Sequence, residues 1–179
     1  MTTTTKPSGT SVLHMTTKEH FLAAYARECA TTKRVLAAYP EDRGDLRPHE
    51  RSKTARELAW VFVVEQGMLI KALTTGFDWS SPPASPPEPP ATIAEIIDAF
   101  DADCRRVVEL VGGMSDEALA TTVQFPVGPK QLGDIPRLDF SWMLLHDQVH
   151  HRGQFSVYLR MAGGKVPSIY GPSADEPWF

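Results

Sequence analysis

The chain has few cysteines and no excess of positive charge, and each shortage excludes a class of protein. Lysine and arginine together number 18, against 22 aspartates and glutamates, so the formal net charge is −4. Proteins that bind the phosphate backbone of DNA or RNA usually carry a basic patch, so no nucleic-acid partner is expected. The two cysteines, Cys29 and Cys104, lie far apart in the sequence. Without a secretion signal, both are expected to be reduced and buried.

Long apolar runs are also missing. No segment approaches the roughly 18–20 apolar residues that a helix needs to span a bilayer, so no membrane association is expected. The opening residues, MTTTTKPSGTS, lack the apolar stretch of a signal peptide. We therefore expect a cytoplasmic protein with a disordered tail over residues 1–15. Residues 16–179, in a chain that is 42% hydrophobic, are predicted to form a single domain.

Three helix starts share one four-residue pattern. A threonine side chain accepts a hydrogen bond from a backbone N–H three residues later, and a glutamate at that position bonds back to the threonine. The pattern precedes apolar residues at helical spacing in three places, Thr16/Glu19, Thr54/Glu57 and Thr92/Glu95. The sequence therefore predicts helices over about 17–38, 54–74 and 93–111. A fourth is predicted to open near Pro136 and continue to Met161.

The predicted fold class is all-α. Four amphipathic helices of this length favour a four-helix bundle, and no convincing strand pattern or repeat competes. A short helix is possible near SDEALA, residues 115–120. The segment SSPPASPPEPP, residues 80–90, cannot be helical and is predicted to be a stiff, extended connector. Because this connector can travel the length of the bundle, the second and third helices could run parallel.

The segment HDQVHHRGQ, residues 146–154, holds three of the six histidines. His146 and His150 lie one helical turn apart, so their imidazoles could bind one divalent metal ion, zinc or nickel. His151 is rotated by about 100° and is not expected to join them. The alternative is a pair of histidines hydrogen-bonded at the edge of the core. A zinc protease is disfavoured, because Asp147 stands where such enzymes carry the longer glutamate.

A third metal ligand is predicted on the second helix. Glu65 lies one turn after Val61 and one turn before Leu69, within an apolar stripe. A buried, ionised carboxylate is costly unless it is paired or bound to a cation. Glu65 could therefore face an arginine, lie at the edge in water, or bind the metal. The predicted ligands are His146, His150 and Glu65, with one position left for water or substrate.

The stretch HDQVHHRGQFSVYLRMAGGKVPSIYGPS resembles the closing segment of the DinB-like (damage-inducible) four-helix-bundle family. The resemblance implies an up-down-down-up bundle, a divalent metal held by histidines, and frequent homodimers. It places His146 and His150 on two ligand positions of the last helix. It also implies a third histidine near position 61. This chain has Val61 there, and valine cannot bind a metal. Glu65, one turn further along the same face, is the candidate replacement.

Two functions remain open from the sequence. Relatives with assigned activities include transferases and isomerases that use low-molecular-weight thiols such as mycothiol or bacillithiol, and some hydrolases. The resemblance therefore implies a metal-dependent enzyme acting on a small molecule. The alternative is a non-catalytic bundle whose degenerate or structural metal site binds a small ligand or protein partner; Val61 favours this reading. Arg152 is predicted to pair with an acidic group such as Asp175 or Glu176, and Gly153 to permit close helix packing.

Overall fold

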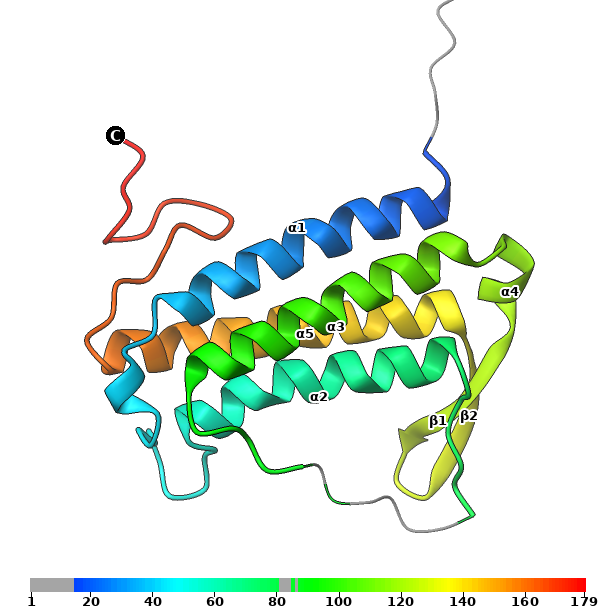
Figure 1. Ribbon diagram of the computed structural model, residues 1–179, viewed down its shortest axis with the longest axis horizontal. Coiled ribbons are helices and arrows are strands. Elements are labelled where there is room, and N and C mark those ends of the chain that lie inside the picture. Colours follow the sequence, from blue (N-terminus) through cyan, green and yellow to red (C-terminus); the bar gives the residue numbers. More distant parts are fainter. Residues whose placement is uncertain (1–14, 81–84, 86) are drawn as a thin grey trace, which may run out of the picture.

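The computed structural model describes residues 15–80, 85 and 87–179. Within them the chain forms four long helices, one short helix, a 3-10 turn and a two-stranded hairpin (Figure 1). The long helices are α1 (Thr17–Ala37), α2 (Ala55–Leu73), α3 (Ile93–Gly113) and α5 (Arg137–Met161). The shorter elements are η1 (Glu41–Arg43), α4 (Asp116–Ala120), β1 (Thr122–Gly128) and β2 (Gln131–Pro136). The predicted tail lies outside the described residues except for Met15.

The three predicted helix starts are confirmed. Thr16, Thr54 and Thr92 each accept from the backbone N–H three residues later, and the glutamate at that position bonds back. These reciprocal bonds satisfy backbone N–H groups that a helix start otherwise leaves without partners. The end of α3 differs slightly from the prediction, since the helix continues through both glycines to Gly113.

The long helices lie side by side in Figure 1, where α2 and α3 run in one direction and α1 and α5 in the other. Helix α1 packs on α3 and α5, and α2 packs on the same two helices. Residues 85 and 87–90 of the Pro-rich segment form neither helix nor strand. The Trp60 indole N–H donates to the carbonyl of Pro87 at 2.7 Å, which fixes this end of the segment beside α2. Residues 81–84 and 86 lie outside the described residues.

The prediction that no strands form was wrong. Strands β1 and β2 pair antiparallel and turn at Lys130, whose φ of 58° is left-handed. The alternation of Val123, Phe125 and Val127 was the signal for β1. The Phe125 ring lies 4.9 Å from that of Phe140 on α5, so the hairpin covers the start of that helix.

Helix α5 is unusual because its buried face is partly polar. Ser141, Gln148 and Arg152 are at most 1% exposed, whereas Met143 and Val157 are 38% and 58% exposed. The stripe that includes Met143, His146, His150 and Val157 therefore faces outward. The polar face of α5 determines which of its side chains meet α2.

Both cysteines are free and buried, as predicted. None of the helices in the described part of the chain has the length and apolar character that crossing a membrane requires.

Candidate metal centre

Glu65 is the buried acid around which the candidate site is built. Its side chain is 3% exposed and points from α2 towards α5. One carboxyl oxygen, Oε1, shares a hydrogen bond of 2.6 Å with Nδ1 of His151. Among the described residues, no group hydrogen-bonds to the other oxygen, Oε2. A buried carboxyl oxygen without a partner is costly and is a ready ligand for a cation.

Asp147 completes a group of three potential ligands. It lies one turn before His151 on α5, with Oδ1 at 3.8 Å from His151 Nδ1. One ligand atom from each of Glu65, Asp147 and His151 lies within 4.8 Å of the others. Ligands bound to one metal at about 2.1 Å lie roughly 3–3.5 Å apart, so shifts of about an ångström would bring these atoms to coordinating positions. The residues fit a divalent metal.

The protonation states in the site follow from burial. Burial, together with the nearby negative charge of Asp147, raises the pKa of Glu65 to about 9. Burial is also the largest influence on His151 and lowers the pKa of its imidazole, although the charge of Asp147 acts in the opposite direction. At neutral pH the site therefore holds a protonated Glu65 beside a neutral His151. A metal ion must displace the proton of Glu65 in order to bind there.

The site opens into a hollow between α2, α5 and the Pro-rich segment. This cavity, of about 540 Å³, is lined by Glu65, Asp147 and His151 together with apolar side chains that include Trp60 and Met68. Val61 lines the same cavity one turn before Glu65, so these two residues share a face as expected. The side chain of Asp147 is 48% exposed, which leaves the outer side of the site accessible to a small molecule.

The predicted ligand set is only partly brought together. Glu65 lies in the site, but His146 and His150 are exposed and line a neighbouring hollow of about 550 Å³ that also includes Asp147. His150 Nε2 instead lies 3.0 Å from the side-chain nitrogen of Gln154. His151, which was not expected to join His146 and His150, is the histidine that faces Glu65, because α5 is rotated to bury Gln148 and Arg152. Asp147 was missed as a ligand, although its four-residue spacing from His151 was a usable signal.

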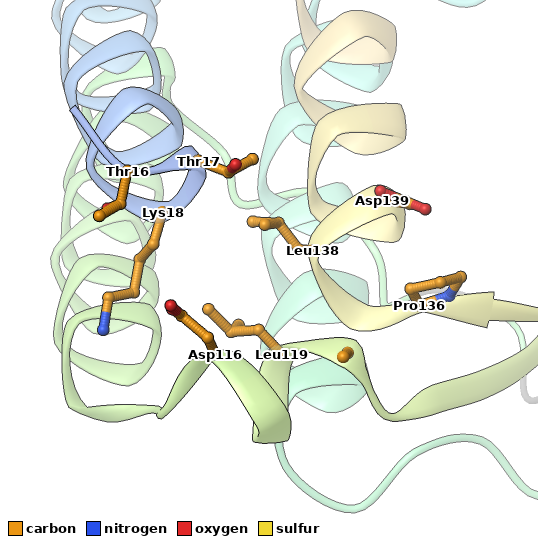
Figure 2. Close-up of a pocket in the computed structure, with 9 residues that line it drawn as sticks. Thr16, Thr17, Lys18, Asp116, Leu119, Pro136, Leu138 and Asp139 are labelled. Carbon is orange, nitrogen blue, oxygen red and sulfur yellow. The ribbon is translucent and has the colours of Figure 1, made fainter. Parts of the chain in front are cut away.

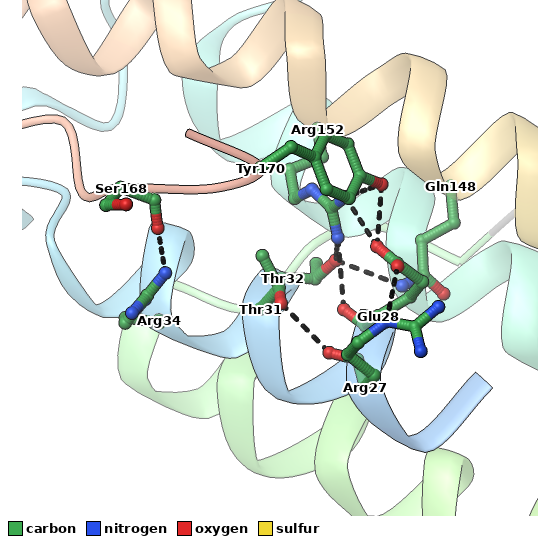
Figure 3. Close-up of polar contacts among 9 residues, drawn as sticks. All are labelled: Arg27, Glu28, Thr31, Thr32, Arg34, Gln148, Arg152, Ser168 and Tyr170. Atoms are coloured by element: carbon green, nitrogen blue, oxygen red, sulfur yellow. Dashed lines mark hydrogen bonds and ion pairs between the residues drawn. The ribbon is translucent and has the colours of Figure 1, made fainter. Parts of the chain in front are cut away.

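Arg152, the next residue of HHRGQ, has a structural role (Figure 3). Arg152 pairs with Glu28 of α1 at 2.6 Å, and the Tyr170 hydroxyl donates to the same carboxylate at 2.8 Å. The prediction that Arg152 pairs with an acidic group is therefore confirmed, but the suggested partners in the C-terminal segment were wrong, since Asp175 pairs with Arg160. Gly153 does not serve close packing, because a Cβ there would meet nothing within 4 Å.

A third hollow, of about 460 Å³, lies where α1 and α5 begin (Figure 2). Its wall carries Lys18, Asp116 and Asp139, but no histidine or cysteine. The Lys18 ammonium donates to the carbonyl of Met114 at 2.9 Å, so it ties α1 to the end of α3. We assign no chemistry to this hollow.

A helical bundle in which a buried glutamate faces an aspartate and a histidine has a candidate metal-binding site. The particular family is shown by sequence: the chain belongs to the DinB family, whose sequence model matches residues 8–178. The uncharacterized protein YrdA of Bacillus subtilis strain 168 is 28% identical over 162 residues, covering 89% of this chain and 92% of YrdA.

Two solved structures share the fold. A DinB-like protein from Bacillus cereus ATCC 10987 superposes with a TM-score of 0.71 at 24% identity, over 85% of this chain and 97% of its own. The DinB-like protein YjoA from Bacillus subtilis gives a TM-score of 0.63 at 14% identity, over 83% and 95% of the two chains. The family resemblance seen in the C-terminal segment is thus confirmed.

Proposed function

We propose that this protein is a metal-dependent enzyme of the thiol-dependent transferase or hydrolase type, acting on a small molecule. Glu65, Asp147 and His151 would hold the metal, zinc or nickel. The observation that carries the proposal is the Oε2 atom of Glu65, which is buried, without a hydrogen bond among the described residues, and beside two further potential ligands.

Each residue of the site has a role that suits this chemistry. The bound metal would lower the pKa of a coordinated thiol or water and so make it a nucleophile. Glu65 and Asp147 supply negative charge that favours a divalent cation, while His151 supplies a neutral nitrogen ligand. Trp60 and Met68 give the cavity an apolar wall against which the substrate can pack.

The remaining expectations belong to the same proposal. We take the scaffold to be the up-down-down-up bundle that the resemblance implies, which the helix directions in Figure 1 support. A cytoplasmic homodimer without a nucleic-acid or membrane partner is proposed from the composition and the resemblance. His146 and His150 remain the alternative ligands, because both border the hollow that includes Asp147.

The second candidate function is a non-catalytic bundle that binds a small ligand or partner. One observation favours it: Glu65 and His151 already satisfy each other at 2.6 Å without a metal. The resemblance implies a third histidine where this chain has Val61. A site that is stable without metal and lacks this histidine need not bind a metal.

Metal titration separates these readings. The chelated protein is titrated with Zn²⁺ and Ni²⁺ by calorimetry, alongside His151→Ala, His150→Ala and Glu65→Gln. We expect His151→Ala to abolish metal binding and Glu65→Gln to weaken it at least tenfold. His150→Ala is the control, because His150 is an exposed histidine next to His151, and it should leave the affinity within about twofold. Loss with His150→Ala but not with His151→Ala would support the ligands predicted from sequence. If the wild type binds neither metal, the non-catalytic bundle is the better interpretation.

A further inference from the structure

Cys29 and Cys104 lie against each other although 75 positions separate them in the chain. Cys29 is on α1 and Cys104 on α3, two helices that pack together. Their Sγ atoms are 2.8 Å apart, and each residue is 6% exposed. A disulfide bond is about 2.05 Å long, so the two sulfurs need to approach by only about 0.8 Å to bond.

A small reagent can reach this pair from one side. Both cysteines line a surface hollow of about 390 Å³ between α1 and α3. Ala26 and Ala30 form part of its wall, and their short, exposed side chains leave the approach to the sulfurs open. Lys33 and Arg105 stand at the same hollow, and both pair with Asp101.

We propose that Cys29 and Cys104 form a site of reversible oxidation, at which a low-molecular-weight disulfide converts the two thiols into a disulfide between α1 and α3. One cysteine, as its thiolate, attacks a sulfur of the small disulfide and releases one small thiol. The second cysteine then attacks the mixed disulfide and releases the other small thiol. Two protein thiols and one small disulfide thus give one protein disulfide and two small thiols.

The surroundings of the thiols determine the rate. The hydrogen bond with Cys29, followed by burial, raises the pKa of the Cys104 thiol. Since the thiolate is the reacting form, oxidation should be slow at neutral pH and accelerate as the pH rises. The cross-link closes a long loop and so constrains the unfolded chain, which should raise the thermal midpoint by about 10 °C.

The test uses the full-length, metal-free protein and bis(2-hydroxyethyl) disulfide as the oxidant. We expect the intact mass to fall by about 2 Da through loss of two hydrogens, peptide mapping to link Cys29 to Cys104, and a reductant to reverse both changes. The Cys104→Ser variant should show at most a mixed disulfide and no rise in the thermal midpoint.

If the Cys104→Ser variant fails to fold, the wild-type protein alone still tests the proposal. After oxidation the protein is denatured and alkylated with iodoacetamide, which labels every remaining thiol. Absence of label on both cysteines, together with the linked peptide, supports the proposal. Two labelled cysteines, a stable mixed disulfide as the end product, or a disulfide between two chains would overturn it. None of these outcomes depends on a metal at Glu65, so the test is independent of the proposed function.

Discussion

Replacing Glu65 by glutamine should change how the stability of the metal-free protein depends on pH. Burial raises the pKa of Glu65 to about 9 in the folded protein, against an ordinary value of 4.5. Between those two pH values the folded chain keeps a proton that the unfolded chain has released. The stabilisation is therefore full below pH 4.5 and is lost progressively as the pH rises through the folded pKa. Glutamine has no such proton, so Glu65→Gln removes this dependence.

The magnitude follows from the linkage relation. One proton retained on folding gives a slope of about 1.4 kcal/mol per pH unit, so the wild type should lose about 2–3 kcal/mol between pH 5.5 and 7.5. Because Glu65 is 3% exposed, solvent screening does not reduce this much. The variant should match the wild type below about pH 4.5, and its stability advantage should grow by about 2–3 kcal/mol between pH 5.5 and pH 7.5. Titration of His151 acts on both proteins and largely cancels in the difference.

Urea unfolding of chelated protein at the two pH values measures this difference. Glu109→Gln is the control, because Glu109 is an exposed glutamate that pairs only with Arg106 among the ion pairs found in the described residues. A difference between wild type and Glu65→Gln that does not change with pH would refute the reasoning. With saturating metal the order should reverse, because the wild type then gains more from metal binding than the variant.

Further predictions concern other residues and ligands. Arg152→Met should destabilise the protein by about 3–5 kcal/mol in urea unfolding, because it removes the buried cation of the 5% exposed Glu28 and leaves only the exposed Arg27 beside it; a loss below 1 kcal/mol would contradict this. Gly67→Ala should raise stability by about 0.5–1 kcal/mol, since a Cβ there meets nothing within 4 Å in a helix interior; a lower urea midpoint would count against it. A low-molecular-weight thiol should raise the thermal midpoint only with metal present, and an equal shift after chelation would place the thiol elsewhere. Random duplex DNA should not bind at physiological salt, because the net charge is −4; tight, salt-sensitive binding would overturn this.

The sequence predicted the helices well because their start signals are local. A threonine and a glutamate three residues apart act within one turn, so their effect is readable without tertiary structure. The hairpin was harder, since the apolar alternation in β1 covers only Val123, Phe125 and Val127 and the Phe125 ring packs on Phe140 of α5. The burial of Glu65 was predicted correctly, because the buried face of α2 follows the spacing of its apolar residues.

Apolar residues such as Phe140, Leu144 and Phe155 mark the buried face of α5, but the polar Gln148 and Arg152 interrupt it, and their burial depends on hydrogen bonds to other helices. Gln148 donates to Thr32 of α1 and accepts from Gln66 of α2, both at 3.0 Å. Arg152 pairs with Glu28 of α1. These partners lie on other helices, so the sequence of α5 alone does not show that Gln148 and Arg152 belong to the buried face.

The same hydrogen bonds explain how the candidate site is positioned. Gln148 directly follows Asp147, and Arg152 directly follows His151. Once Gln148 and Arg152 are buried against α1 and α2, the preceding residue of each pair turns towards α2, where Glu65 lies next to Gln66. A buried polar group that loses its partner is costly, so a rotation of α5 by one residue would break several of these bonds at once. The polar core of α5 therefore selects Asp147 and His151, rather than His146 and His150, as the side chains that face the buried glutamate.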